Sequence, residues 1–191
     1  MRRLSYRHLL AAVGIIALPV STPAQTVPVN IPDTVGAFVL KETEVLNSGD
    51  LVVRYMDSEG QHADLYIYPP TDYFEDAASD SIVLDAHAAD FVESLKYGVA
   101  QGWWETYSLV MEPRPIVAKT ASGEATGRVS VFVFRKRGQV YVSLMHLFLV
   151  NEQFVKSRVS LPAEGWDQTD KSRFGLQVME QLAPAQSSLA P

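Results

Sequence analysis

Cysteine is absent from this sequence of 191 residues, and its absence excludes several classes of structure and chemistry. The chain can form no disulfide bond, no thiolate metal site and no thiol nucleophile, and it has no cysteine that a lipid could modify. The fold must therefore be stabilised by a hydrophobic core. A chain of this size can bury a sufficient core without crosslinks.

Histidine is scarce, and the sequence motifs of common enzymes are missing. Apart from His8 near the start, the histidines are His62, His87 and His146. No serine lies in a Gly-x-Ser-x-Gly or Ser-x-x-Lys motif, and the glycines show neither the spacing nor the lysine of a phosphate-binding loop. The sequence therefore does not indicate a serine hydrolase or a P-loop protein.

Long apolar runs are missing except at the start of the chain. Arg2, Arg3 and Arg7 precede an apolar run over residues 9–20, and small residues follow at 22–24. This order of charged, apolar and small residues is typical of a secretory signal peptide. The apolar run is shorter than the roughly 20 residues that cross a bilayer.

Residues 1–24 are accordingly predicted to be a signal peptide that is removed near Ala24, with an uncleaved anchor as the alternative. The mature chain would begin near Gln25, have no transmembrane segment, and be periplasmic or secreted. An exported protein of this size without disulfides fits a bacterial envelope compartment better than a small disulfide-rich secreted module.

Basic residues are also fewer than acidic ones. The sequence holds 16 Lys and Arg against 22 Asp and Glu, which gives a formal net charge of −6. Removing residues 1–24 takes away three arginines and no acidic residue, so 13 basic residues remain against 22 acidic ones, a net charge of −9. A protein this acidic is not expected to bind nucleic acid.

Short runs rich in Val, Phe, Tyr and Leu predict β-strands. Residues 25–35 carry two prolines and predict an extended arm. Turn-forming residues then separate three expected strands, which together make a first meander. These strands are Phe38–Leu46, Leu51–Met56 and His62–Tyr68.

A second meander is predicted over Gly127–Leu161, where polar breaks at Arg135–Gln139 and Asn151–Gln153 define three strands. A strand at Glu105–Met111 is expected before it, then a break at prolines 113 and 115, and then a short strand or loop at Ile116–Thr126. The segment Gly127–Leu161 is the most apolar of these, so its sheet face needs a cover.

Two amphipathic segments are predicted to be helices. Spacings of three and four residues place the apolar side chains of Leu84–Val99 on one stripe and its charged side chains outside that stripe. The N-cap of this helix is expected at Ser79 or Asp80. A second, weaker helix is expected over Asp167–Leu182, and residues 183–191 have too little apolar content to fold.

These elements predict one α+β domain over residues 25–182, with a single antiparallel sheet of about six or seven strands covered on one face by both helices. The element order, the strand start at Gly138–Tyr141 and the amphipathic C-terminal helix resemble the PsbP/MOG1-like α+β sandwich of exported bacterial and thylakoid-lumen accessory proteins. Ile31–Phe38 and Phe154–Val159 also resemble uncharacterised exported bacterial proteins. The resemblance implies a non-enzymatic binding or accessory role and supplies no catalytic residue.

Polar and aromatic side chains alternate with aliphatic ones in several of the expected strands. If both helices cover one face of the sheet, these side chains share the open face, where they would form a platform of stacking rings and charged donors. The candidate binding residues are Arg54, Asp64, Tyr66, Tyr68, Tyr141, Ser143, Lys156 and Arg158. An ordinary half-solvated sheet face is the alternative interpretation.

The preferred hypothesis is an exported, non-enzymatic binding or accessory protein that presents this face, or a cleft beside it, to an envelope protein or a small ligand. No cofactor or metal is indicated. An envelope hydrolase or metal-dependent enzyme would have to use His87, Asp90 and His146, for which further metal ligands have no visible source. A chaperone with a large exposed apolar patch is a third hypothesis. The oligomeric state is left open.

Overall fold

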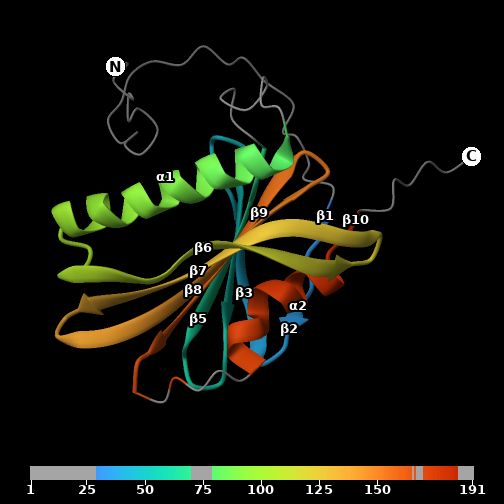
Figure 1. Ribbon diagram of the computed structural model, residues 1–191. Coiled ribbons are helices and arrows are strands. Elements are labelled where there is room, and N and C mark those ends of the chain that lie inside the picture. The colour runs from blue at the N-terminus through green and yellow to red at the C-terminus, as the bar shows by residue number, and fades with distance from the viewer. Residues whose placement is uncertain (1–28, 70–78, 165, 167–169, 185–191) are drawn as a thin grey trace, which may run out of the picture.

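The computed structural model describes residues 29–69, 79–164, 166 and 170–184 (Figure 1). The predicted signal peptide, residues 1–24, and the last part of the predicted tail, residues 185–191, lie outside these ranges. The main element of the described chain is an eight-stranded antiparallel sheet. Two helices pack against this sheet, and a two-stranded sheet joins the two ends of the described chain.

The order of strands across the main sheet is β2-β3-β4-β5-β9-β8-β7-β6. Only the neighbours β5 and β9 are not consecutive in the chain, so this one pairing joins the two predicted meanders. The strands are β2 (Thr34–Val35), β3 (Phe38–Val45), β4 (Leu51–Met56), β5 (His62–Tyr68), β6 (Thr106–Thr120), β7 (Gly123–Lys136), β8 (Gln139–Val150) and β9 (Gln153–Pro162). Strands β4 and β5 begin and end at the predicted residues.

The predicted number of strands is wrong, and the edge strands explain the error. Prolines 113 and 115 predict a break, but β6 runs without interruption from Thr106 to Thr120. Because β6 is an edge strand, a proline without an N–H can face away from the sheet, and the pairing with β7 shifts register on both sides of Met111. At the other edge, β2 adds a short strand from the predicted arm.

The prediction that both helices cover one face is also wrong. Helix α1 (Asp80–Ala100) contacts β6, β7 and β8, whereas α2 (Phe174–Gln181) lies on the other face, against β2, β6, β8 and β9 (Figure 1). The sheet curls, so that strands from both of its edges, β2 and β6, reach α2. The result is a curled sheet with one helix on each face.

The physical reason is that the second meander is apolar on both faces. In β8, Met145 and Leu147 pack with Leu84 of α1, while Phe148 packs in the cluster that contains Phe174 of α2. Neighbouring residues of a strand point to opposite faces, so each face of β8 has to be covered separately. One helix on each face therefore covers both apolar sides of this meander.

The predicted helix at Leu84–Val99 is present as α1, which begins four residues earlier, at Asp80, after Ser79 as N-cap. Leu84, Ala88 and Leu95 are fully buried on its apolar stripe, as its periodicity predicts. Phe91 is only half-buried. The predicted C-terminal helix is shorter: a 3-10 helix, η2 (Asp170–Arg173), leads into α2.

The ends of the described chain meet in a second, two-stranded sheet. Strand β1 (Val29–Asn30), from the predicted arm, pairs antiparallel with β10 (Ala183–Pro184), the first two residues of the predicted tail (Figure 1). Neither helix of the described chain is long and apolar enough to cross a membrane.

Candidate binding site

Six of the predicted binding residues lie together on one face of β4, β5 and β9. Asp64 is directly opposite Arg54 on one side and Arg158 on the other, and Tyr66 is directly opposite Lys156. Residues opposed in an antiparallel pair point to the same side of the sheet. We call this set the cation–aromatic face; its members are Arg54, Asp64, Tyr66, Tyr68, Lys156 and Arg158.

The cation–aromatic face lies on the same side of the sheet as α1 and borders that helix. The Tyr68 hydroxyl and His87 Nε2 of α1 are 2.5 Å apart, and the His87 ring stacks on Phe154 with centroids 4.3 Å apart. Burial, followed by the charge of Lys156, lowers the pKa of His87 to about 4. Burial also raises the pKa of Tyr68, so a neutral phenol and a neutral imidazole share this hydrogen bond.

All six residues are half-buried, although the sequence predicted open, solvent-facing positions. Burial raises the pKa of Asp64 and of Tyr66 above their ordinary values. The helix α1, which the prediction placed on the opposite face, lies on this face and covers β7 and β8, and it reaches Tyr68 through His87. The cation–aromatic face is therefore half-buried and borders a helix.

The ammonium group of Lys156 lies over two tyrosine rings of this face. Its Nζ lies 4.8 Å from the centroid of Tyr66 and 5.4 Å from that of Tyr68. Burial, helped by the nearby charge of Arg158, lowers the pKa of Lys156 to about 8. The ammonium group is thus held where its charged form is poorly solvated.

Arg158 is fixed at one edge of its guanidinium group. Its Nε donates to Ser143 Oγ at 3.1 Å and to Ser160 Oγ at 3.2 Å. The sequence grouped Ser143 with the binding residues, and in the structure it is buried and positions Arg158. Burial lowers the pKa of Arg158.

Three aromatic rings surround the guanidinium carbon of Arg158. The centroids of Phe132, Phe134 and Trp104 lie 5.2, 5.4 and 5.6 Å from it. Sequence reasoning missed these rings as part of the site. Alternation along β7 puts Phe132 and Phe134 on one face, but only the pairing of β7, β8 and β9 places that face beside Arg158.

Lys156 and Arg158 lack an acidic partner within the part of the chain that the structure describes. No carboxylate there lies within ion-pair distance of either cation. Lys156 Nζ and the terminal nitrogens of Arg158 also have no hydrogen-bond acceptor among the described residues. Arg54 differs, because it pairs with Glu42 at 2.7 Å and Glu44 at 3.2 Å.

Tyr141 lies apart from the other predicted binding residues. Its ring stacks on Phe134 with centroids 5.1 Å apart, and its hydroxyl donates to Gln139 Oε1. It belongs to the aromatic cluster beneath the C-terminal half of α1, which contains Leu95 and Phe132. Tyr141 therefore supports the rings around Arg158 from the side.

The residues of the alternative enzyme hypothesis do not meet. His87 lies on the α1 face, whereas His146 is buried on the α2 face, where its Nδ1 and Ser157 Oγ lie against Gly175. Asp90 is exposed on α1. Among the described residues, no group of three or more His, Cys, Asp or Glu side chains lies close enough together to hold a metal ion.

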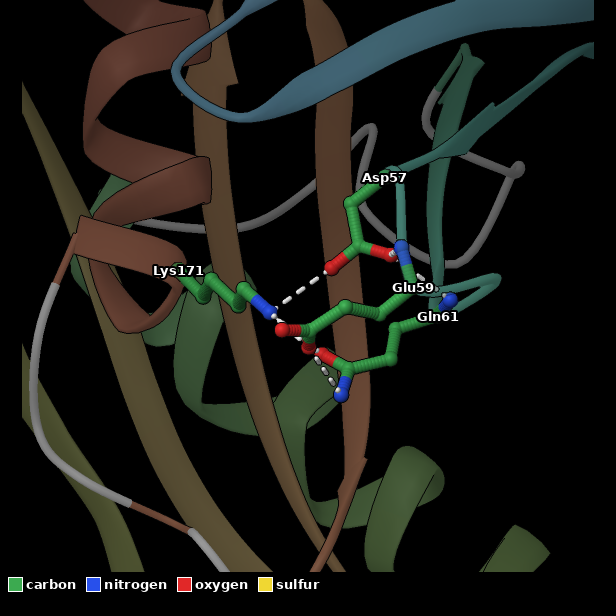
Figure 2. Close-up of polar contacts among 4 residues, drawn as sticks. All are labelled: Asp57, Glu59, Gln61 and Lys171. Carbon is green, nitrogen blue, oxygen red and sulfur yellow. Dashed lines mark hydrogen bonds and ion pairs between the residues drawn. The ribbon is translucent and has the colours of Figure 1, made fainter.

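A separate polar cluster joins the β4–β5 turn to η2 (Figure 2). Lys171 Nζ lies 2.8 Å from Asp57 Oδ2, 2.7 Å from Glu59 Oε2 and 2.9 Å from Gln61 Oε1. Asp57 Oδ1 accepts the backbone N–H groups of Glu59 and Gln61. Lys171 thus donates hydrogen bonds to Glu59 and Gln61 and forms an ion pair with the buried Asp57, so this cluster ties η2 to the β4–β5 turn.

In comparisons with known proteins, no family model and no curated sequence matches this chain. The functional proposal therefore depends on the chemistry of the site. Two cations that have no carboxylate at ion-pair distance among the described residues, set among aromatic rings on neighbouring strands, can pair with a negatively charged group and stack against a flat one.

Proposed function

We propose that this protein is an exported, non-enzymatic binding or accessory protein that holds its ligand in the recess formed by the cation–aromatic face and α1. The observation that carries the proposal is the pair of half-buried cations, Lys156 and Arg158, which lack an acidic partner among the described residues. The proposed export rests on the signal-peptide pattern of residues 1–24.

A purely structural role for these cations is less favourable. Desolvating an ion costs several kcal/mol, whereas a cation over an aromatic ring gains about 0.5–2 kcal/mol. An apolar residue at position 156 or 158 would fill the same space without that cost. The cations therefore make physical sense if a bound partner supplies the missing negative charge.

Catalysis has weaker support than binding. An enzyme needs several of its titratable groups to converge in one pocket. His87 borders the recess, but Asp90 points to solvent and His146 lies across the sheet.

The proposal is tested by equilibrium dialysis of the mature chain, which is expected to begin near Gln25, against a fractionated envelope extract. We expect the wild type to retain a specific component and Arg158→Gln to lose it at unchanged secondary structure. Lys119→Gln, which removes an exposed cation from β6, is the matched control and should retain it. Equal retention by wild type and Arg158→Gln would contradict the proposal, as would the absence of any retained component.

A further inference from the structure

We infer, on the basis of the proposed function, that the ligand is a small organic anion. Its acidic group, a carboxylate or a phosphate, pairs with Lys156 and Arg158, and its flat body lies against the neighbouring rings. The two cations are two residues apart on one face of β9, so their backbone positions are about 7 Å apart. One acidic group between them can reach both side chains.

The fixed orientation of Arg158 favours an oxyanion. Ser143 and Ser160 hold Nε, so the terminal nitrogens of the guanidinium group remain available for a ligand. A guanidinium fork can bind a carboxylate or a phosphate through two parallel hydrogen bonds. The surrounding rings keep the fork in place and exclude water from its faces, which strengthens a charged hydrogen bond.

The charges around the recess also favour an anion. Asp64 is the acidic member of the cation–aromatic face, and it lies beyond ion-pair distance of Arg158 within the described structure. Arg54 is already neutralised by Glu42 and Glu44. Lys156 and Arg158 thus remain without a carboxylate at ion-pair distance among the described residues, and Asp64 acts on Arg158 only over a longer distance.

The half-buried position of these groups favours a small molecule over a flat protein surface. Lys156 lies between the rings of Tyr66 and Tyr68, and α1 borders the recess through His87. Ligand sites of this kind combine apolar walls with a few polar groups that fix the orientation of the ligand. An anionic ring compound can place its acid at the cations and its ring beside the tyrosines.

The inference is tested by isothermal titration of the folded mature chain with three probes of similar shape: benzoate, phenyl phosphate and neutral benzyl alcohol. At least one of the two anions is expected to bind ten times more tightly than the alcohol, and the preferred anion identifies the acidic group. Lys156→Met and Arg158→Gln should each weaken that binding by about ten- to a hundredfold.

The matched control is Lys136→Gln. Lys136 is an exposed cation that lines a neighbouring cavity of about 620 Å3 with Trp103 and Trp104, so this variant also detects an anion bound there instead. The affinity of the Lys136→Gln variant for the preferred anion should equal that of the wild type. Thermal melts control for folding: Lys156→Met should be at least as stable as the wild type, because it removes a poorly solvated charge.

Proton linkage gives an independent readout. Lys156, with its pKa near 8, is partly neutral at mildly alkaline pH, and a bound anion favours its charged form. Binding near pH 8.5 should therefore take up a proton, seen as a heat that changes with the ionisation enthalpy of the buffer. The affinity should fall as the pH rises above 8, and Lys156→Met should abolish both effects.

The outcomes separate this inference from the proposed function. If no anion binds, or if the alcohol binds as tightly as the anions, the ligand is not an organic anion. In that case the proposed function still stands if Arg158→Gln loses the component retained from the envelope extract. If that component is also retained by Arg158→Gln, both proposals are wrong.

Discussion

His146 shows how burial sets the charge of a single residue. Its residue exposure is 4%, its ring stacks on Phe148, and Nδ1 lies against Gly175 of α2. Burial lowers the pKa of His146 to about 4, so the imidazole is neutral in the folded protein at neutral pH. In the unfolded chain the same imidazole takes up a proton near pH 6.5.

The free energy of unfolding should therefore fall as the pH drops from about 6.5 to about 4, because the unfolded state binds the proton and the folded state does not. The shift corresponds to at most about 3 kcal/mol for His146. In urea melts over this pH range, the free energy of unfolding of His146→Leu should fall less with pH than that of the wild type. The buried His87, whose pKa is also lowered, should account for part of the pH dependence that remains. His62→Gln, at an exposed position, is the control; identical slopes for wild type and His146→Leu would contradict the assignment.

Helix α1 is an element anchored at both ends by contacts to the sheet. Near its start, the buried Arg128 of β7 donates from Nε to Asp85 Oδ1 at 2.6 Å and from Nη2 to Ser81 Oγ at 2.8 Å. Near its end, Trp104 Nε1 donates to the carbonyl oxygen of Leu95. The indole also packs so closely on Gly98 that a Cβ there would collide with it. These contacts hold α1 beside the proposed recess.

Two exposed aspartates of α1 should therefore differ in their effect on stability. Asp85→Ala leaves the buried guanidinium group of Arg128 with neutral acceptors only, at a cost of about 1–2 kcal/mol. Asp90→Ala removes an exposed carboxylate and should cost less than about 0.5 kcal/mol. Urea melts at neutral pH measure both changes, and equal costs would show that Arg128 does not anchor the helix.

At the scale of the whole molecule, contacts between segments that are distant in the sequence hold the curled sheet together. Lys171 of η2 and Glu59 of the β4–β5 turn are 112 positions apart, and β1 pairs with β10 across the whole described chain. Asp57 carries the most buried carboxylate of the Lys171 cluster, with a side-chain exposure of 1%. Its pKa is lowered: burial alone would raise it, but the hydrogen bond from Lys171 and those from the backbone outweigh that effect.

Lys171→Met should destabilise the fold by about 2–3 kcal/mol, because it removes the cation that pairs with the buried carboxylate of Asp57. Glu59→Gln, which changes an exposed partner of the same lysine, should cost much less. The double variant Asp57→Asn with Lys171→Met should cost less than the two single changes added together, since each removes the same contact. Strict additivity in denaturant melts would contradict this coupling.

Local patterns in the sequence determined which residues share a face. In β5, Leu65 and Ile67 alternate with Asp64, Tyr66 and Tyr68, and the structure keeps the two sets on opposite sides. Turn formers delimited β4 and β5, and the helical repeat of Leu84–Val99 identified its buried stripe. These features depend on backbone geometry over a few residues, so the sequence alone is sufficient to predict them.

Only the tertiary structure decided which face each helix covers and what the charged residues meet. Both faces of β8 are apolar, so alternation cannot tell which one α1 occupies, and the proline rule that predicts a break in β6 does not hold at a sheet edge. Lys156 meets Tyr66 because β5 pairs with β9, and Arg158 meets Trp104 because α1 ends above β7. These contacts join segments far apart in the chain, and they form because of the free energy of burying the whole apolar surface at once.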